Sequence, residues 1–191
     1  MLFALLFLPV THHALRITVF MRKGYIQVYT GNCKGKTTAA LGLALRAAGA
    51  GLRVFIAQFI KKRKCSEHKA LERFSDLITV KQYGTGFLRG KRPKAAIDSA
   101  RKGFAEVSEI ITSGEYDVVI LDEVNVATHN NLFSVEELLD LLDAKPSPME
   151  LILTGRYADE RVVDKADLVT EMREIKHYAR KGVKARVGIE C

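Results

Sequence analysis

The clearest chemical pattern in the sequence is a short run that mixes glycine, lysine and threonine. From residue 30 it reads Thr-Gly-Asn-Cys-Lys-Gly-Lys-Thr-Thr. Glycines permit a tight turn whose backbone N–H groups converge on anionic oxygens, and a helix that begins at the turn adds positive potential. Lys36 supplies a point charge, and the Thr37 hydroxyl is placed to ligate Mg2+. The run predicts a phosphate loop for ATP with Mg2+, or alternatively Mn2+, formed by Gly31, Asn32, Cys33, Lys34, Gly35, Lys36, Thr37 and Thr38.

The spacing of this run departs from the usual P-loop pattern at one position. That pattern places a glycine five residues before the glycine of Gly-Lys-Thr, but Thr30 stands there and Gly31 follows it. We therefore expect a loop that is one residue tighter than usual. The alternative is a plain turn before a basic helix, which the strand-like run before it and the helix-like run after it disfavour.

A pair of acidic residues ends the apolar run 118–121. A buried strand of this kind delivers an acid to the sheet edge beside the phosphate loop. We expect Asp122 to hold the metal directly or through water, together with Thr37 and Glu123. Glu123 would orient attacking water in a hydrolase, but would ligate metal or position substrate in a transferase. We assign catalysis to Lys36, Thr37 and Glu123. An alternative interpretation of the acidic pair Asp122 and Glu123 is that it simply begins a helix.

Two further predicted strand ends face the same edge of the sheet. Gln58 and Phe59 follow one strand, and Arg156 follows another within Thr-Gly-Arg. Arg156 suits a phosphate, or the carboxamide or carboxylate edge of a substrate, with ordinary loop structure as the alternative. His177 is a candidate ligand, although a lone histidine more often lies at the surface or packs against neighbours.

These residues need a parallel sheet to bring them together. Short β-branched or aromatic runs alternate with segments of helical period, which is typical of βαβ units. We predict a three-layer α/β/α fold of the P-loop NTPase type, RecA-like, with a mostly parallel sheet. The predicted strands are 25–29, 53–59, 78–82, 118–121, 151–153 and one from 168; the predicted helices are 37–48, 66–74, one around 97–111 that Gly114 ends, one capped by Ser134 with Glu137, and 159–166. We predict a mobile surface loop over 83–94.

Composition limits the class of protein. Residues 21–191 are enough for one globular domain, in a chain of which 48% is apolar. Cys33, Cys65 and Cys191 have neither disulfide-framework nor zinc-site spacing, so a reducing cytoplasm is expected. The net charge of +8 suits nucleic acid as well as a polyphosphate. Because no basic stretch is interleaved with aromatic residues, we predict no nucleic-acid partner.

Residues 1–20 differ from the rest of the chain. The apolar run 1–10 lacks the basic flank and the cleavage site of a signal peptide, and it is too short to span a bilayer. We predict a non-native or disordered extension, with Met21 as the functional start and no stable membrane association. A weak membrane-surface helix is the alternative.

Five motifs in the same order resemble the P-loop class of ATP:cob(I)alamin adenosyltransferases, which also act on cob(I)yrinic acid a,c-diamide. They lie at residues 31–40, 58–61, 122–125, 153–156 and 170–173, within a resemblance that covers nearly all of 23–190. The resemblance implies a shortened P-loop that holds ATP reversed, so that ribose C5′ faces the nucleophile. It also implies transfer of 5′-deoxyadenosyl to Co(I) with release of triphosphate, contacts from Asn125 and Arg156, a flavoprotein reductant and a homodimer.

The chain also departs from that family pattern. Cys33 replaces a loop glycine, the basic run 61–64 replaces a glycine-containing turn, residues 86–89 lack a tryptophan, and Tyr178 stands where many relatives have proline. We expect these four departures to affect the contacts with the corrinoid more than the ATP site. The main alternative function is a RecA-like nucleic-acid-dependent ATPase, which would release phosphate. A small-molecule kinase, which would transfer the γ-phosphoryl group, is a third hypothesis.

Overall fold

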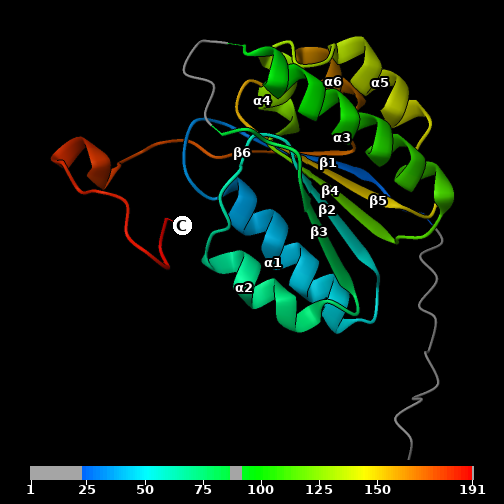
Figure 1. The fold of residues 1–191 in the computed structure, drawn as a ribbon, viewed down its shortest axis with the longest axis horizontal. Coiled ribbons are helices and arrows are strands. Elements are labelled where there is room, and N and C mark those ends of the chain that lie inside the picture. The colour runs from blue at the N-terminus through cyan, green and yellow to red at the C-terminus, as the bar shows by residue number, and fades with distance from the viewer. Residues whose placement is uncertain (1–22, 87–91, 191) are drawn as a thin grey trace, which may run out of the picture.

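A parallel β-sheet forms the centre of the fold (Figure 1). The computed structural model describes residues 23–86 and 92–190, and within these ranges the sheet has six strands in the order β3-β2-β4-β5-β1-β6. Each pair of neighbouring strands is parallel. The strands are β1 Ile26–Thr30, β2 Val54–Gln58, β3 Ile78–Gln82, β4 Val118–Asp122, β5 Glu150–Thr154 and β6 Leu168–Glu171.

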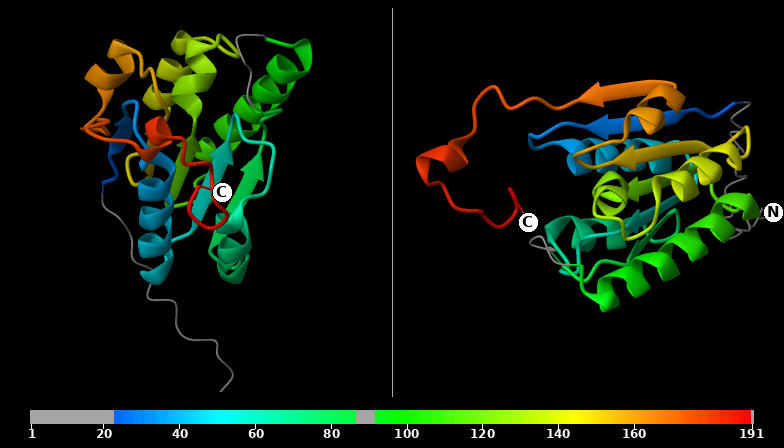
Figure 2. Two further views of the ribbon diagram at one scale, coloured as in Figure 1. Left: turned by 90° about the vertical axis from the view of Figure 1, so that its left-hand side faces the viewer. Right: turned by 90° about the horizontal axis from the view of Figure 1, so that it is seen from above.

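Helices cover both faces of this sheet, which gives three layers (Figures 1 and 2). On one face lie α1 (Lys36–Gly49) and α2 (Ser66–Leu71), the latter continued by a 3-10 turn, η1 (Glu72–Phe74). On the other face lie α3 (Lys94–Ser113), α4 (Val124–His129), α5 (Val135–Asp143) and α6 (Glu160–Lys165). After β6 the chain leaves the sheet and forms a short 3-10 turn, η2 (Tyr178–Lys181), which lies beyond the carboxyl ends of the strands and apart from the sheet (Figures 1 and 2).

Each face of the sheet has its own apolar cluster because successive strand side chains point to opposite sides. Phe55 and Leu121 pack toward α3 to α6, whereas Ile56 and Ile120 pack toward α1. Every residue of β2 and β4 is buried, since helices cover these strands on both sides. This burial explains why their sequences are continuous apolar runs rather than alternating ones.

The predicted fold class is confirmed, and most predicted elements are present with ends shifted by one or two residues. Strand 78–82 matches β3, and Gly114 ends α3 in a left-handed conformation with φ 69°. Ser134 caps α5 as predicted, because its hydroxyl accepts from Glu137 N at 3.1 Å. The predicted helix 66–74 is instead α2 followed by the tighter turn η1. The short helix α4 and the turn η2 were not among the predicted elements.

Two sequence predictions fall wholly or partly outside the described residues. The extension 1–20 lies outside them, and so does the part 87–91 of the predicted surface loop. Within the described ranges, no helix is both long enough and apolar enough to cross a membrane.

Gly103 lets α3 approach the segment that follows β3, which provides a test of the packing. A Cβ at this position would lie 2.3 Å from Cγ of the buried Tyr83 ring. Gly103→Ala should therefore lower the free energy of unfolding by roughly 1–3 kcal/mol, the usual cost of overpacking. The control is Gly42→Ala in α1, where nothing lies within 4 Å. It should raise the same quantity by about 0.5–1 kcal/mol.

Urea unfolding of the two variants measures both values. Similar effects at the two positions would contradict the packing of α3 on Tyr83.

Candidate active site

The phosphate loop connects β1 to α1, and glycine geometry shapes it. Gly31 and Gly35 have φ values of 94° and 119°, which side chains rarely tolerate. A Cβ on Gly31 would also lie 2.5 Å from the carbonyl oxygen of Met172, just after β6. Met172 fixes the loop from behind, since its N–H donates to Thr30 O at 2.9 Å and its carbonyl accepts from Cys33 N at 3.0 Å. Because the Cys33 N–H already donates to the Met172 carbonyl, it points away from the side on which an anion would bind.

Lys36 lies at the centre of the loop. Its ammonium donates to the carbonyl oxygens of Gly31 at 2.8 Å and Cys33 at 2.7 Å, and the residue is only 7% exposed. Burial is the main cause that lowers the pKa of Lys36, and the nearby Glu123 carboxylate opposes this effect. The loop thus holds a desolvated positive charge at the position where the sequence predicted one.

The carboxylate of Asp122, at the end of β4, is fully buried and hydrogen-bonded on both oxygens. Oδ1 accepts from the hydroxyls of Thr37 and Thr154, each at 2.8 Å. Oδ2 accepts from Gln58 Nε2 at 3.0 Å and from the Lys61 ammonium at 3.1 Å. The predicted juxtaposition of Thr37 and Asp122 is therefore present in the structure.

The environment of Thr37 and Asp122 fits a hard cation. The Lys61 ammonium lies 3.1 Å from Thr37 Oγ1 and also 3.1 Å from Asp122 Oδ2, so these two oxygens already share a positive charge. Hydroxyl and carboxylate oxygens are the ligands that Mg2+ prefers, usually one or two from protein with the rest from phosphates and water. Among the residues that the structure describes, no group of three or more His, Cys, Asp or Glu gathers into a protein-only metal site.

Glu123 combines backbone strain with a perturbed charge. It adopts a left-handed conformation, with φ 62°, and directly precedes α4, while its N–H donates to Thr154 Oγ1 at 3.0 Å. Burial raises the pKa of its carboxyl, with a further contribution from the Asp122 charge. Lys61, Lys36 and Arg156 lower that pKa in part. The residue does begin a helix, as the alternative interpretation held, but strain and desolvation of this kind are typical of functional sites.

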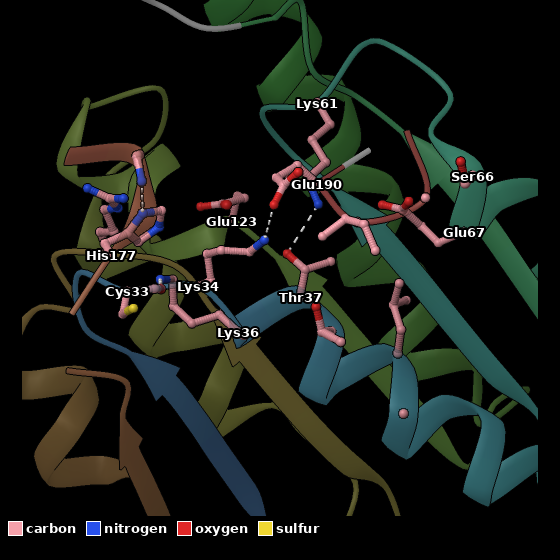
Figure 3. Close-up of a pocket in the computed structure, with 18 of the residues that line it drawn as sticks. Cys33, Lys34, Lys36, Thr37, Lys61, Ser66, Glu67, Glu123, His177 and Glu190 are labelled. Atoms are coloured by element: carbon pink, nitrogen blue, oxygen red, sulfur yellow. Dashed lines mark hydrogen bonds and ion pairs between the residues drawn. The ribbon is translucent and has the colours of Figure 1, made fainter. Parts of the chain in front are cut away.

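These groups open on one cavity of about 980 Å3 (Figure 3). Of the predicted residues, those that line it are Asn32, Cys33, Lys34, Gly35, Lys36, Thr37, Thr38, Glu123 and Arg156. Gly31 and Asp122 lie behind the lining, where they contact Lys36 and Thr37. Asn125 is also set back, only 1% exposed, with its amide nitrogen 3.5 Å from Gly155 O beneath the turn that carries Arg156.

The C-terminal segment lines the same cavity, which the sequence analysis missed apart from His177. The Lys34 ammonium lies 2.7 Å from the Glu190 carboxylate and donates to Tyr178 OH at 2.8 Å. The Lys34 ammonium, followed by the Tyr178 hydroxyl and by Arg186, holds the pKa of Glu190 well below its ordinary value. His177 lines the cavity, but its Nδ1 accepts from Ala179 N at 3.1 Å and so caps η2. No motif marks Glu190, because Lys34, the partner that joins it to the phosphate loop, is far away in the sequence.

Lys61 was also not assigned to the site. Its ammonium contacts both Thr37 and Asp122, although in the sequence it only begins a run of four basic residues, 61–64. Its position directly after Gln58-Phe59-Ile60 at the end of β2 is the signal that pointed to this edge.

The raised pKa of Glu123 generates a prediction on stability. Above its ordinary value of 4.5 the carboxyl is ionised in the unfolded chain, so the buried charge destabilises the fold, and this cost vanishes as pH falls below that value. Glu123→Gln should therefore raise the thermal midpoint near neutral pH, by roughly 2–4 °C per kcal/mol of cost removed. The gain should shrink as pH is lowered toward 4.5.

Thermal scans of the nucleotide-free protein over this pH range measure the effect. Glu109→Gln, at an exposed position on α3, is the control and should change little. A gain that does not depend on pH would refute the electrostatic origin.

Comparisons with known proteins give relatives along most of the chain. A corrinoid adenosyltransferase from Sinorhizobium sp is 36% identical over 172 residues, which cover 88% of this chain and 80% of that protein. A corrinoid adenosyltransferase from Pseudomonas aeruginosa is 31% identical over 170 residues, covering 88% of this chain and 84% of the relative.

A similar fold occurs in a solved structure. The flagellar accessory protein FlaH from Methanocaldococcus jannaschii superposes with a TM-score of 0.56 at 11% identity, over 78% of this chain and 71% of that one. At this identity the likeness concerns the fold alone.

The family model for ATP:corrinoid adenosyltransferases BtuR/CobO/CobP matches residues 22–191. This match covers the phosphate loop, the Asp122 cluster and the C-terminal segment described above. The chain belongs to the ATP:corrinoid adenosyltransferase family.

Proposed function

We propose that this chain transfers the 5′-deoxyadenosyl group of ATP to the Co(I) centre of a corrinoid and releases triphosphate. The observation that carries the proposal is the phosphate loop, with its buried Lys36, opening together with Glu123 on a cavity of about 980 Å3. This volume is at the upper end of the range for small-ligand pockets, which suits a nucleotide that meets a second substrate. Cob(I)alamin and cob(I)yrinic acid a,c-diamide are the two corrinoids that we propose.

The proposed reaction needs no proton transfer. Co(I) donates an electron pair to C5′ of the ribose, the bond from C5′ to the triphosphate oxygen breaks, and its electrons leave on triphosphate. Cobalt becomes formally Co(III) with a new Co–C bond. The protein therefore has two tasks, which are to orient C5′ toward cobalt and to neutralise the charge of the leaving group.

The basic residues of the site suit the second task. Lys36 is held by two loop carbonyls, and Lys61 lies beside Thr37, so both ammonium groups are fixed near the start of α1. Arg156 lines the cavity on the β5 side. We assign the triphosphate to Lys36 and the loop amides, in the reversed orientation that the family resemblance implies. Arg156 would contact the nucleotide from the cavity wall, and Asn125 would contribute from beneath the turn that carries Arg156.

We further propose that Mg2+ is held by Thr37 and Asp122, with Glu123 beside them, and that Mn2+ can replace it. When bound, the ion would neutralise negative charge on the triphosphate. Since no base is required, Glu123 has the role of positioning the metal and the substrate. Its left-handed backbone and desolvation support such a role.

Cobalt must arrive as Co(I), so a reductant has to act first, and we assign this step to a flavoprotein. We also propose a homodimer in the cytoplasm, without nucleic acid. The C-terminal segment supports a protein partner because Ile175 and Val187 are 92% and 86% exposed, which is high for large apolar side chains.

An anaerobic assay with Co(I) corrinoid and ATP tests the reaction. We expect triphosphate to appear in equal amount to the alkylcobalt product, which has its own absorption spectrum. Orthophosphate in place of triphosphate, with or without corrinoid, would exclude adenosyl transfer. Phosphate release stimulated by nucleic acid would instead support the RecA-like ATPase alternative.

A substitution of Lys36 tests the charge that stabilises the leaving group. Lys36→Met keeps an unbranched side chain that is one atom shorter and removes its charge, so kcat/KM for adenosyl transfer should fall by roughly 10²–10³-fold. The matched control is Lys102→Met, an exposed lysine on α3, which should keep kcat/KM near the unsubstituted value. Equal losses in both variants would argue against a specific role for Lys36.

A further inference from the structure

A chain of buried hydrogen bonds leads from α2 to Asp122. His68, only 6% exposed, lies with its Nε2 2.7 Å from Gln58 Oε1. Gln58, only 1% exposed, donates from Nε2 to Asp122 Oδ2 at 3.0 Å. His68 does not line the large cavity, and among the residues that the structure describes its hydrogen bond with Gln58 is the link to Asp122.

The direction of each hydrogen bond in this chain is determined. The backbone N–H of Cys65 can only donate, and it points to His68 Nδ1 at 2.9 Å, so that nitrogen carries no proton. The neutral ring then has its proton on Nε2 and donates to Gln58 Oε1. Because Oε1 of Gln58 faces His68, its amide nitrogen must face Asp122. Gln82 supports the same orientation by donating to Gln58 Oε1 at 3.0 Å.

The orientation of the Gln58 amide matters for Asp122. A rotated amide would place an oxygen against Asp122 Oδ2, which already carries negative charge. The other donor to Oδ2 is the Lys61 ammonium, which also contacts Thr37. If Gln58 rotated, Oδ2 would keep only the Lys61 ammonium as a donor and would face the oxygen of the Gln58 amide, which would disfavour the present orientation of the carboxylate.

We propose that His68 is a positioning residue that acts through Gln58. It holds the Asp122 carboxylate in the orientation in which its two oxygens face Thr37 and Lys61, the place assigned above to Mg2+. The inference rests on the proposed function only in taking this place as the metal site. Groups that hydrogen-bond a metal ligand directly, as Gln58 does Asp122, commonly change metal affinity by roughly 10–100-fold when they are lost, so an effect at the lower end is expected for His68, one step further out.

Two substitutions of His68 separate this role from packing. His68→Asn keeps an oxygen acceptor for the Cys65 N–H, but its side chain is too short to reach Gln58. His68→Gln is longer and places an amide N–H where Nε2 donates to Gln58. Lys69→Asn, at an exposed position on the same helix, controls for the effect of asparagine in α2.

The measured quantity is the gain in ATP affinity that Mn2+ brings. It is the ratio of the Kd for ATP with EDTA to the Kd with Mn2+, both from calorimetric titration of the whole protein. This ratio does not depend on the fraction of active protein. We expect His68→Asn to reduce it about tenfold. His68→Gln and Lys69→Asn should keep it within about threefold, which is close to the scatter of single hydrogen-bond effects.

The possible results separate the role of His68 from the existence of the metal site. An unchanged ratio in His68→Asn would overturn the role of His68. So would an equal reduction in His68→Asn and His68→Gln together with a lower thermal midpoint in both, since that result describes a packing residue. If Mn2+ brings no gain even in the unsubstituted protein, the proposed metal site itself is wrong, while the adenosyl-transfer assay still tests the reaction independently.

Discussion

The fold of this protein is organised around one buried charge. The Asp122 carboxylate is 0% exposed, and an ionised group without water is tolerated only where hydrogen bonds or opposite charge compensate for its lost hydration. Its donors come from separate parts of the chain: Thr37 from α1, Gln58 from β2, Thr154 from β5 and Lys61 from the segment after β2. Satisfying one carboxylate therefore requires the ends of several elements to meet at the same edge of the sheet.

The strand order explains how they meet. β4 lies between β2 and β5, so Asp122 has Gln58 on one neighbouring strand and Thr154 on the other. Glu123 follows directly and takes a left-handed backbone while its N–H bonds to Thr154. The strain at Glu123 and the burial of Asp122 thus belong to the same network, and the cavity lies on its open side.

The parts of this site that the sequence could predict are those encoded locally. The loop before α1 and the apolar strand before Asp122 each depend on a few neighbouring residues, and each is present. The capping box of Ser134, a feature of the fold outside the site, is local in the same way. Lys61 and Glu190 were missed because their roles depend on partners that only the fold brings close. His68 was missed for a related reason. Its role depends on which of its two ring nitrogens carries the proton, and the Cys65 N–H that determines this is placed by the fold. Asn125 shows the reverse case, since it belongs to a conspicuous motif but is set back beneath a turn.

Met172 joins the phosphate loop to the strand at the opposite end of the chain by two backbone hydrogen bonds. Because the carbonyl of Met172 lies where a side chain on Gly31 would have to go, the contour of the loop matches that of the peptide behind it. An insertion or deletion in either segment would break this register unless the other changed with it. The shortness of the loop and the path of the chain after β6 are therefore expected to vary together during evolution, as a single inherited unit.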